Sequence, residues 1–220
     1  GSTRIPEPAA ARRELEARRA ACAAHPGDEE CARRVRIAGR ILEKSRYYDV
    51  ARQFGQLVAR ADQGRDGSHL VILTGGGPGI MEAANRGAFD VGAKSVGLNI
   101  RLPHEQFPNP YITPDLCMRF HYFALRKLHF LLRAKALVVF PGGYGTLDEL
   151  FETLTLVQTR KIKPVPVVLV GEEYWRQVFN PDFLVDEGVI DPEDRELFWY
   201  AETAEEIWQG ILHWYASTGL

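Results

Sequence analysis

The pattern of hydrophobic and polar positions changes near residue 69. Before it, residues 8–24 and 29–61 place apolar side chains among charged ones at helical spacing. Asp28 stands directly before the second stretch, where a helix N-cap belongs, and Gly39 predicts an interruption within it. The first part of the chain is therefore expected to consist of helices.

From residue 69, short runs of Val, Ile and Leu alternate with helical patterns. Continuous apolar runs of this kind are typical of strands in a parallel sheet that is covered on both faces. The predicted strands are residues 69–74, 94–100, 136–140 and 165–170. The predicted helices are 81–92, 118–134, 146–159 and 203–215; the second is apolar on nearly every face and hence expected to be buried, and the last carries a stripe of Ile207, Trp208, Ile211 and Leu212.

This alternation of strands and helices predicts the fold class. We expect a doubly wound, Rossmann-like α/β fold, with a mostly parallel sheet, helices on both faces and an N-terminal helical extension. We divide the chain into an N-terminal helical region, 1–62, and a nucleotide-binding domain, 63–220, which together form one compact domain.

Composition narrows the classes of function. The 27 basic and 29 acidic side chains give a formal net charge of −2, which argues against a general nucleic-acid binder. No apolar run approaches the roughly 20 residues that span a bilayer, and no secretory signal opens the sequence, so a cytoplasmic protein without a membrane partner is expected. Cys22, Cys31 and Cys117 are odd in number and lack C-x-x-C spacing, so we interpret each as a small, half-buried apolar residue.

Two glycine-rich turns follow predicted strands, "TGGGPGI" at 74–80 and "PGGYGT" at 141–146. In a doubly wound sheet, ligands bind at the carboxyl ends of the strands, and the amides at a helix N-terminus favour an anion. Two such turns in one chain predict a phosphorylated or otherwise anionic ligand.

Neither turn matches the common nucleotide motifs. A Walker motif requires Gly-Lys-Ser/Thr, which is absent from both turns. Gly75, Gly77 and Gly79 have G-x-G-x-G spacing, and Asn99 and Arg101 stand where a dinucleotide-binding fold places the acid that holds a ribose. These departures argue against NAD.

Several side chains allow a structural and a functional interpretation. Arg126 and Lys127 lie in an apolar helix, where a buried cation requires a partner, and an ion pair with a structural acid is the usual one. Thr146 and Glu149 have the spacing of a helix capping box, an alternative to a role of Glu149 in catalysis. The three histidines His104, His121 and His129 lack metal-binding spacing, so no metal site is expected.

The motifs "TGGGPGIMEAANRGA", "LRK" (125–127) and "PGGYGTLDE" together resemble the LOG family of cytokinin riboside 5′-monophosphate phosphoribohydrolases, long labelled lysine decarboxylases. "SVGLNI", "LPHEQFPNPY" and "LTLVQT" are similar to its longer bacterial branch, and the resemblance covers residues 45 to 215. It implies hydrolysis of the N-glycosidic bond of a nucleoside 5′-monophosphate, of the AMP or cytokinin riboside type, to the free base and ribose 5-phosphate. No cofactor is implied, and relatives are dimers or larger, so a homodimer or larger homo-oligomer is expected.

Two other interpretations stay open. A superfamily relative, the molybdenum cofactor carrier protein, shares the fold and binds without hydrolysing, so the alternative is a non-catalytic nucleotide- or cofactor-binding carrier. A structural oligomer that has kept the fold is the third. A decarboxylase would need a lysine Schiff base to pyridoxal phosphate, and Lys127 is already explained by the family's Arg-Lys pair.

The resemblance also assigns residues. It implies that Arg126 and Glu149 are catalytic, with the Glu149 carboxylate facing a ribosyl oxocarbenium ion while backbone amides at 142–146 hold the 5′-phosphate. Family members open with a β-strand that ends in Gly-Ser, so we expect a first strand before Gly1, with a cloning scar as the alternative. The implied substrate-binding residues are Gly76, Gly77, Gly79, Glu82, Asn85, Lys127, Gly142, Gly143, Tyr144, Gly145 and Thr146, with Ser2, Arg4 and Met81 as further candidates.

Overall fold

The computed structural model describes residues 1–25, 27–63, 70–101 and 107–219. The chain forms two compact units, one of residues 2–118 and the other of residues 119–220 together with Gly1. The predicted division at residue 62 falls within the first unit, at the end of a helix, and stays a prediction. His104 and the first residue of the predicted strand 69–74 lie outside the described residues.

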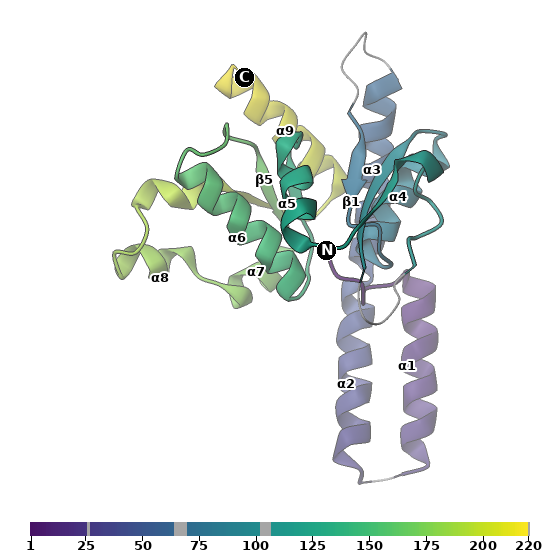
Figure 1. Ribbon diagram of the computed structural model, residues 1–220. Helices are drawn as coiled ribbons and strands as arrows, with labels where there is room; N and C mark the ends of the chain where they lie inside the picture. The colour runs from purple at the N-terminus through teal and green to yellow at the C-terminus, as the bar shows by residue number, and fades with distance from the viewer. Residues whose placement is uncertain (26, 64–69, 102–106, 220) are drawn as a thin grey trace. The chain divides into compact units, whose positions relative to one another are not determined.

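Three helices open the first unit: α1 (Pro8–Ala23), α2 (Glu29–Lys44) and α3 (Arg46–Gln63). Figure 1 shows α1 and α2 side by side as an antiparallel hairpin. The side chain of Asp28 accepts hydrogen bonds from the amides of Glu30 and Cys31, which confirms the predicted N-cap.

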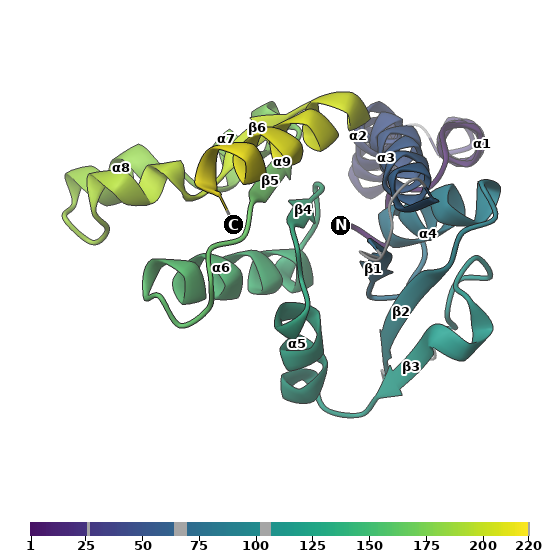
Figure 2. The same cartoon turned by 90° about the horizontal axis from the view of Figure 1, so that it is seen from above.

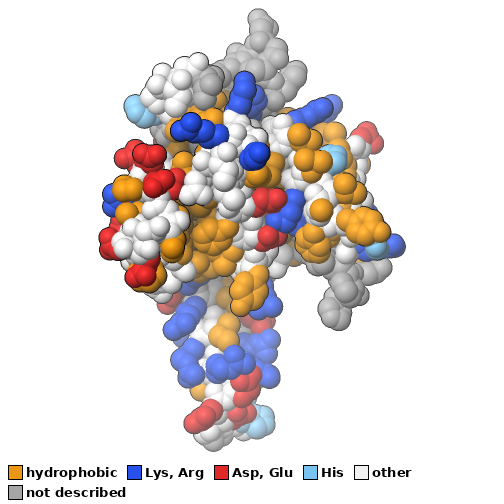
Figure 3. Space-filling view, turned by 60° about the vertical axis from the view of Figure 1, so that its left-hand side comes forward, with side chains coloured by type: hydrophobic (Ala, Val, Ile, Leu, Met, Phe, Trp, Pro, Cys, Tyr) orange, Lys and Arg blue, Asp and Glu red, His pale blue; other side chains and the backbone are white. Residues whose placement is uncertain are grey.

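The predicted interruption at Gly39 is wrong, because α2 runs through it and ends only at Ser45. Glycine costs a helix interior about 1 kcal/mol relative to alanine, and packing against a neighbouring helix offsets such a cost. Along this hairpin Arg and Lys side chains alternate with Asp and Glu, and Figure 3 shows this mixed charged surface.

The first sheet has the strand order β1 (Ile72–Thr74), β2 (Ser95–Ile100), β3 (Cys117–Phe120), with β1 parallel to β2. The helix α4 (Ile80–Asp90) connects β1 to β2, and a short 3-10 helix, η1 (Pro114–Leu116), precedes β3. Figure 2 shows α3 and α4 together beside this sheet. The two helices approach closely because each has a glycine at the contact: a Cβ at Gly87 would collide with the Arg52 carbonyl, and one at Gly55 with the Ala84 carbonyl.

The second unit contains three parallel strands in the order β4 (Leu137–Val139), β5 (Val167–Val170), β6 (Trp199–Ala201). Figure 2 shows α6 on one side of these strands and α9 on the other. A core cluster joins β4 and β5 to α6 and α7 and is built from Val139, Leu150, Val167, Leu169, Trp175 and Phe198. The helices of this unit are α5 (Phe123–Leu132), α6 (Tyr144–Gln158), α7 (Glu172–Val178), α8 (Pro181–Asp186), the 3-10 helix η2 (Pro192–Leu197) and α9 (Ala204–Thr218).

The predicted fold class is confirmed: parallel strands alternate with helices that cover both faces, and a helical extension opens the chain. The tail helix begins at a capping box of Thr203 and Glu206, and it buries Ile207 and Ile211 of the predicted stripe. No helix in the described part of the chain is both long enough and apolar enough to cross a membrane.

The prediction of one buried helix over 118–134 is wrong in two respects. Residues up to Phe120 belong to β3, because aromatic and alternating side chains favour a strand and an all-round apolar pattern cannot separate strand from helix. The helix α5 then buries none of its residues, since it turns its two cations, Arg126 and Lys127, toward the acids of α6. Its larger apolar side chains Phe123, Leu125, Leu128 and Leu132 are left exposed.

Candidate active site

The turn "PGGYGT" joins the end of β4 to the start of α6, whose N-cap is Gly143. Gly142 is buried beneath the side chain of Thr146, and a Cβ at Gly142 would collide with the Thr146 hydroxyl. From the other side, the Tyr174 hydroxyl donates a hydrogen bond of 2.6 Å to the Gly142 carbonyl. The turn is therefore fixed by a hydroxyl on each side, and only glycine fits at position 142.

The amides at the start of α6 are not equivalent. Those of Thr146 and Leu147 both donate to the Gly143 carbonyl, at 2.9 and 3.1 Å. Among the described residues, no backbone acceptor is found for the amides of Tyr144 and Gly145, as expected at the first turn of a helix. Both residues are exposed, so these two amides remain as donors for an anion, while that of Thr146 is engaged.

The capping-box interpretation of Glu149 is wrong. The helix starts two residues before Thr146, at Tyr144, so Thr146 lies inside the first turn and its side chain covers Gly142. No side chain caps this helix. Glu149 therefore does not cap α6.

Glu149 faces Arg126 instead. The distance from Arg126 Nη2 to Glu149 Oε1 is 3.7 Å, which is an ion pair but too long for a hydrogen bond. The two side chains are only 12% and 22% exposed. Among the residues that the structure describes, no hydrogen-bond partner is found for Arg126 Nε or for Glu149 Oε1. The two predicted catalytic side chains are thus brought together, partly buried and incompletely hydrogen-bonded.

Burial dominates the electrostatics of this pair. It raises the pKa of Glu149 above its ordinary value, although Lys127 and Arg126 act in the opposite direction. It also lowers the pKa of Arg126, an effect that Glu149 partly opposes. The Arg126 guanidinium lies 5.2 Å from the ring centre of Phe123 and 5.5 Å from that of Phe130. At these distances both rings attract the cation by cation–π interaction.

Lys127 is engaged with protein groups. Its Nζ lies 2.7 Å from a carboxylate oxygen of Asp148 and 2.8 Å from one of Glu152. Burial opposes the charge of Lys127, but these two carboxylates raise its pKa overall. Beside it lies a cavity of about 510 Å³ along α6, lined by Lys127, Tyr144, Leu147, Asp148, Phe151, Glu152, Thr155 and Leu156. The sequence analysis did not include Asp148 and Glu152 in the site. Their i, i+4 spacing puts both carboxylates on one face of α6, where they can bind one lysine, and this spacing could have indicated them.

The first turn, "TGGGPGI", lies between β1 and α4 in the other unit. Gly76 and Gly79 both have φ of +71°, which favours glycine, and Gly79 is the N-cap of α4. The Ile80 amide donates to the Ser2 carbonyl at 3.1 Å, and a Cβ at Gly79 would lie 2.5 Å from the same oxygen. The chain near Ser2 is therefore packed on the start of α4, and the Ser2 hydroxyl accepts from the Arg4 amide.

Asn85 holds this turn together. Its side chain is fully buried; Oδ1 accepts from the Thr74 hydroxyl at 2.7 Å and from Asn109 Nδ2 at 3.0 Å, and Nδ2 donates to the Ser95 hydroxyl at 3.0 Å. Asn109 also donates to the carbonyl of Gly77. Thr74, Ser95 and Asn109 were missed by the sequence reasoning because nothing marks them as partners of one buried amide. A ligand contact of Asn85 stays a prediction.

Glu82 belongs to a second polar network of this unit. The Tyr48 hydroxyl donates to Glu82 Oε1 at 2.8 Å, and Arg86 contacts both Tyr48 and Glu7. Burial raises the pKa of Tyr48 to about 12, with the neighbouring Glu82 acting in the same direction. Met81 is half-buried. Within residues 1–25, 27–63, 70–101 and 107–219, no group of three or more His, Cys, Asp or Glu side chains could hold a metal ion.

The fold and these two turns define a Rossmann-like α/β protein with exposed amides at the start of α6 and a partly buried Arg–Glu pair. The family model described as "Possible lysine decarboxylase" matches residues 81–211. The chain is 31% identical over 171 residues to the cytokinin riboside 5′-monophosphate phosphoribohydrolase LOG3 of Arabidopsis thaliana, covering 75% of this chain and 74% of that protein. It is 30% identical over 173 residues to the probable phosphoribohydrolase LOGL3 of Oryza sativa subsp. japonica, covering 74% and 75%. The chain belongs to the LOG family.

Solved structures agree on the fold. The X-ray structure of TM1055 superposes with a TM-score of 0.53 at 24% identity, covering 77% of this chain and 89% of that one. The Moco carrier protein of Chlamydomonas reinhardtii superposes with a TM-score of 0.51 at 21% identity, covering 78% and 89%. At these identities the likeness concerns the fold alone.

Proposed function

We propose that this protein hydrolyses the N-glycosidic bond of nucleoside 5′-monophosphates, of the AMP or cytokinin riboside monophosphate type. The products are the free base and ribose 5-phosphate. The observation that carries the proposal is the Arg126–Glu149 pair, partly buried and without hydrogen bonds at Arg126 Nε and Glu149 Oε1 among the described residues. The similar proteins of Arabidopsis thaliana and Oryza sativa carry the corresponding activity in their names.

Each group has a role in this chemistry. The transition state resembles a ribosyl oxocarbenium ion, which a nearby carboxylate stabilises. Glu149 supplies that carboxylate and accepts a proton from the water that attacks C1′. The exposed amides of Tyr144 and Gly145, at the positive end of α6, bind the 5′-phosphate. Arg126 orients Glu149 and donates to oxygens of the bound nucleotide.

A non-catalytic carrier is the alternative, and the structural neighbour titled as a Moco carrier protein motivates it. A carrier needs the amides of the glycine turn but not a buried carboxylate. Incubation of the protein with AMP, followed by chromatography, separates the two: the enzyme releases adenine and ribose 5-phosphate, whereas a carrier binds AMP in equilibrium dialysis and returns it intact. Adenosine, which lacks the 5′-phosphate, is the matched substrate control. If adenosine were hydrolysed as fast as AMP, the protein would not recognise the 5′-phosphate.

Substitutions of Arg126 test the proposed role of its planar guanidinium group. Arg126→Ala should abolish base release. Arg126→Lys should restore little, because an ammonium group cannot make two parallel contacts; we expect a loss of roughly 10²-fold or more in turnover. Steady-state rates with AMP provide the measurement. Wild-type turnover in Arg126→Lys would reduce the role of Arg126 to that of a general positive charge.

We extend the proposal to a homodimer, supported by the exposed apolar side chains of α5. Leu128 and Leu132 are 51% and 67% exposed, which is unusual for neighbouring leucines on one helix. Light scattering should give twice the chain mass for the wild type and the chain mass for a Leu128→Glu, Leu132→Glu double variant. Val189→Glu, at another exposed apolar position (66%), is the matched control and should stay dimeric. A monomeric wild type at all concentrations would exclude the dimer.

A further inference from the structure

The tip of the helical hairpin brings two of the three cysteines together. Cys22 is the second-last residue of α1, and Cys31 is the third residue of α2. Both are half-buried free thiols. Because the helices run antiparallel and a short connection joins them, the last turn of α1 lies opposite the first turn of α2 (Figure 1).

The two thiols lie near each other. The nearby Cys22 is the largest cause that raises the pKa of Cys31 to about 11. Burial and the Asp28 carboxylate act in the same direction, while Arg34 opposes them. Cysteines on facing turns of two adjacent helices can form a disulfide when their Cβ atoms point toward each other.

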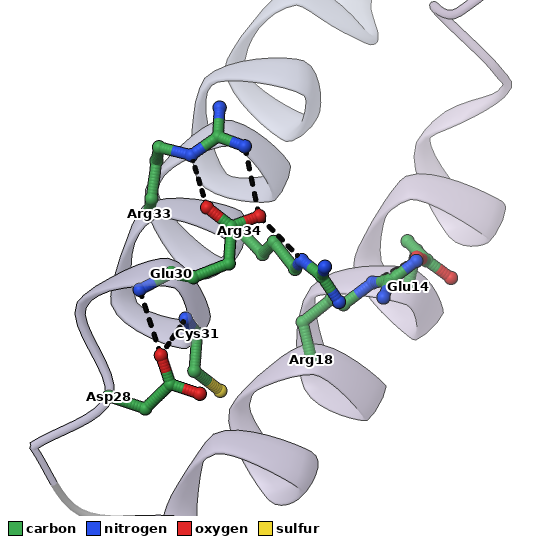
Figure 4. A network of polar contacts seen from close by, with 7 residues as sticks. All are labelled: Glu14, Arg18, Asp28, Glu30, Cys31, Arg33 and Arg34. Carbon is green, nitrogen blue, oxygen red and sulfur yellow. Dashed lines mark hydrogen bonds and ion pairs between the residues drawn. The ribbon is translucent and has the colours of Figure 1, made fainter.

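The backbone around Cys31 is fixed. Asp28 accepts hydrogen bonds from the amides of Glu30 and Cys31, at 2.9 and 3.2 Å. Glu30 is in turn held by ion pairs with Arg33 and Arg34. Figure 4 shows this network on the first turn of α2, with the sulfur of Cys31 pointing toward the side of α1. The thiol therefore faces its partner from a capped, hydrogen-bonded helix start.

We propose that Cys22 and Cys31 are a modification site: a small-molecule disulfide oxidises the pair to an intrachain disulfide that links α1 to α2 at the tip of the hairpin. The proposal is independent of the activity proposed above. It concerns a redox-sensitive link in the N-terminal extension and not the chemistry of the glycine turns.

The reaction is a thiol–disulfide exchange in two steps. The Cys22 sulfur, as thiolate, attacks one sulfur of the oxidant and expels the other as a thiolate, leaving a mixed disulfide on Cys22. Cys31 then loses its proton to solvent, attacks the Cys22 sulfur and expels the second small thiolate. Two protein thiols and one small disulfide become one protein disulfide and two small thiols.

The sequence around the pair permits a direct test on the full-length chain. No Lys or Arg lies between Arg19 and Arg33, so trypsin releases both cysteines in one peptide, residues 20–33. The reduced protein is incubated with oxidised glutathione, its remaining thiols are alkylated, and its peptides are weighed. We expect peptide 20–33 without alkyl or glutathione groups and lighter by two hydrogen atoms than the reduced peptide. Cleavage after Glu29 or Glu30 should then leave its two halves joined until a reductant is added.

Single substitutions supply the controls. Cys117→Ser should leave the linked peptide unchanged, while Cys22→Ser and Cys31→Ser should each abolish it and leave glutathione on the remaining thiol of that peptide. Hydrogen exchange over residues 20–33 should slow on oxidation of the wild type, recover with reductant, and not respond in Cys22→Ser. Alkylation or glutathione addition at both Cys22 and Cys31 of the oxidised wild type, without a linked peptide, would overturn the proposal.

Discussion

The two glycine turns follow parallel strands in the same way, yet their polar surroundings differ. Around "TGGGPGI", the buried amide of Asn85 is hydrogen-bonded to Thr74, Ser95 and Asn109, and Asn99 Oδ1 is the one buried oxygen there without a partner among the described residues. Around "PGGYGT", the buried charges of Arg126 and Glu149 approach only to 3.7 Å, and each has an unpaired polar atom. A satisfied network stabilises a fold, whereas charged groups removed from water without a full set of hydrogen bonds destabilise it.

We propose that this difference separates structural from catalytic polar groups. Burial raises the pKa of Glu149, so the folded chain carries a carboxylate whose charge burial disfavours. Such groups are concentrated at sites where a ligand completes their hydrogen bonds. The comparison therefore assigns stability to the Asn85 network and chemistry to the Arg126–Glu149 pair, and substitutions can test each assignment.

The largest effect is expected for Glu149→Gln. Removal of the carboxylate should lower AMP turnover by roughly 10²–10⁴-fold, the usual cost of losing acid–base participation. The free energy of unfolding should stay the same or rise, because a buried charge is removed and no helix cap is lost. Rate measurements and urea unfolding on the same preparation give both quantities. A variant with wild-type turnover would make the second turn a binding site without catalysis.

Asn85→Ala should show the opposite behaviour. It leaves the polar atoms of Thr74, Ser95 and Asn109 without their buried partner, at a cost of about 3 kcal/mol in the free energy of unfolding. The folded fraction should retain its turnover per molecule. Urea unfolding measures the loss, with Gln177→Ala, an exposed amide on α7, as the control. Full stability together with lost nucleotide binding would instead make Asn85 a ligand contact.

Much of this fold could be predicted from the sequence because it rests on local signals. Apolar runs in the sequence predicted the strands β2, β4 and β5. Asp28 and Thr203 predicted the starts of α2 and α9. The errors arose where tertiary contacts decided. Packing within the hairpin carries α2 through Gly39, and the acids of α6 attract the cations of α5 so that its leucines are left exposed.

In the candidate site, too, some residues could be predicted from the sequence and others could not. Arg126 and Glu149 could be named from the motifs that resemble the family, and the structure brings them together. The partners of Asn85 and Lys127 could not, because a hydrogen bond between residues 74 and 85 or an ion pair between residues 127 and 152 depends on how the elements pack. The start of α6 at Tyr144 likewise depends on the fit of Thr146 over Gly142, and it decides which amides remain free.

A smaller effect should distinguish neighbouring glycines of the second turn. Gly142→Ala forces the new methyl group against the Thr146 hydroxyl and should cost about 1–3 kcal/mol of stability. Gly143→Ala is the matched control: among the described residues nothing lies within 4 Å of its Cβ, and its φ of −89° suits any residue, so its stability should change by less than about 0.5 kcal/mol. Thermal or urea unfolding gives both values. Equal costs at the two positions would contradict the packing of Thr146 on Gly142.

The smallest effect is the pH dependence that Glu149 imposes on stability. Because its folded-state pKa lies above the ordinary value near 4.5, the folded chain binds the proton more tightly than the unfolded chain. The resulting stabilisation is complete below the ordinary pKa and is lost as the pH rises through the raised one.

The wild type should therefore match Glu149→Gln near pH 4 and fall below it in free energy of unfolding as the pH approaches 7. Urea unfolding at a series of pH values measures this gap, and Glu173→Gln, an exposed carboxylate on α7, should show no such trend. The acid limb of AMP turnover should follow the same raised pKa, since the proposed reaction requires the ionised carboxylate. A gap that narrowed with rising pH would mean that attraction to Arg126 and Lys127 outweighs burial, and the contrast between the two turns would then disappear.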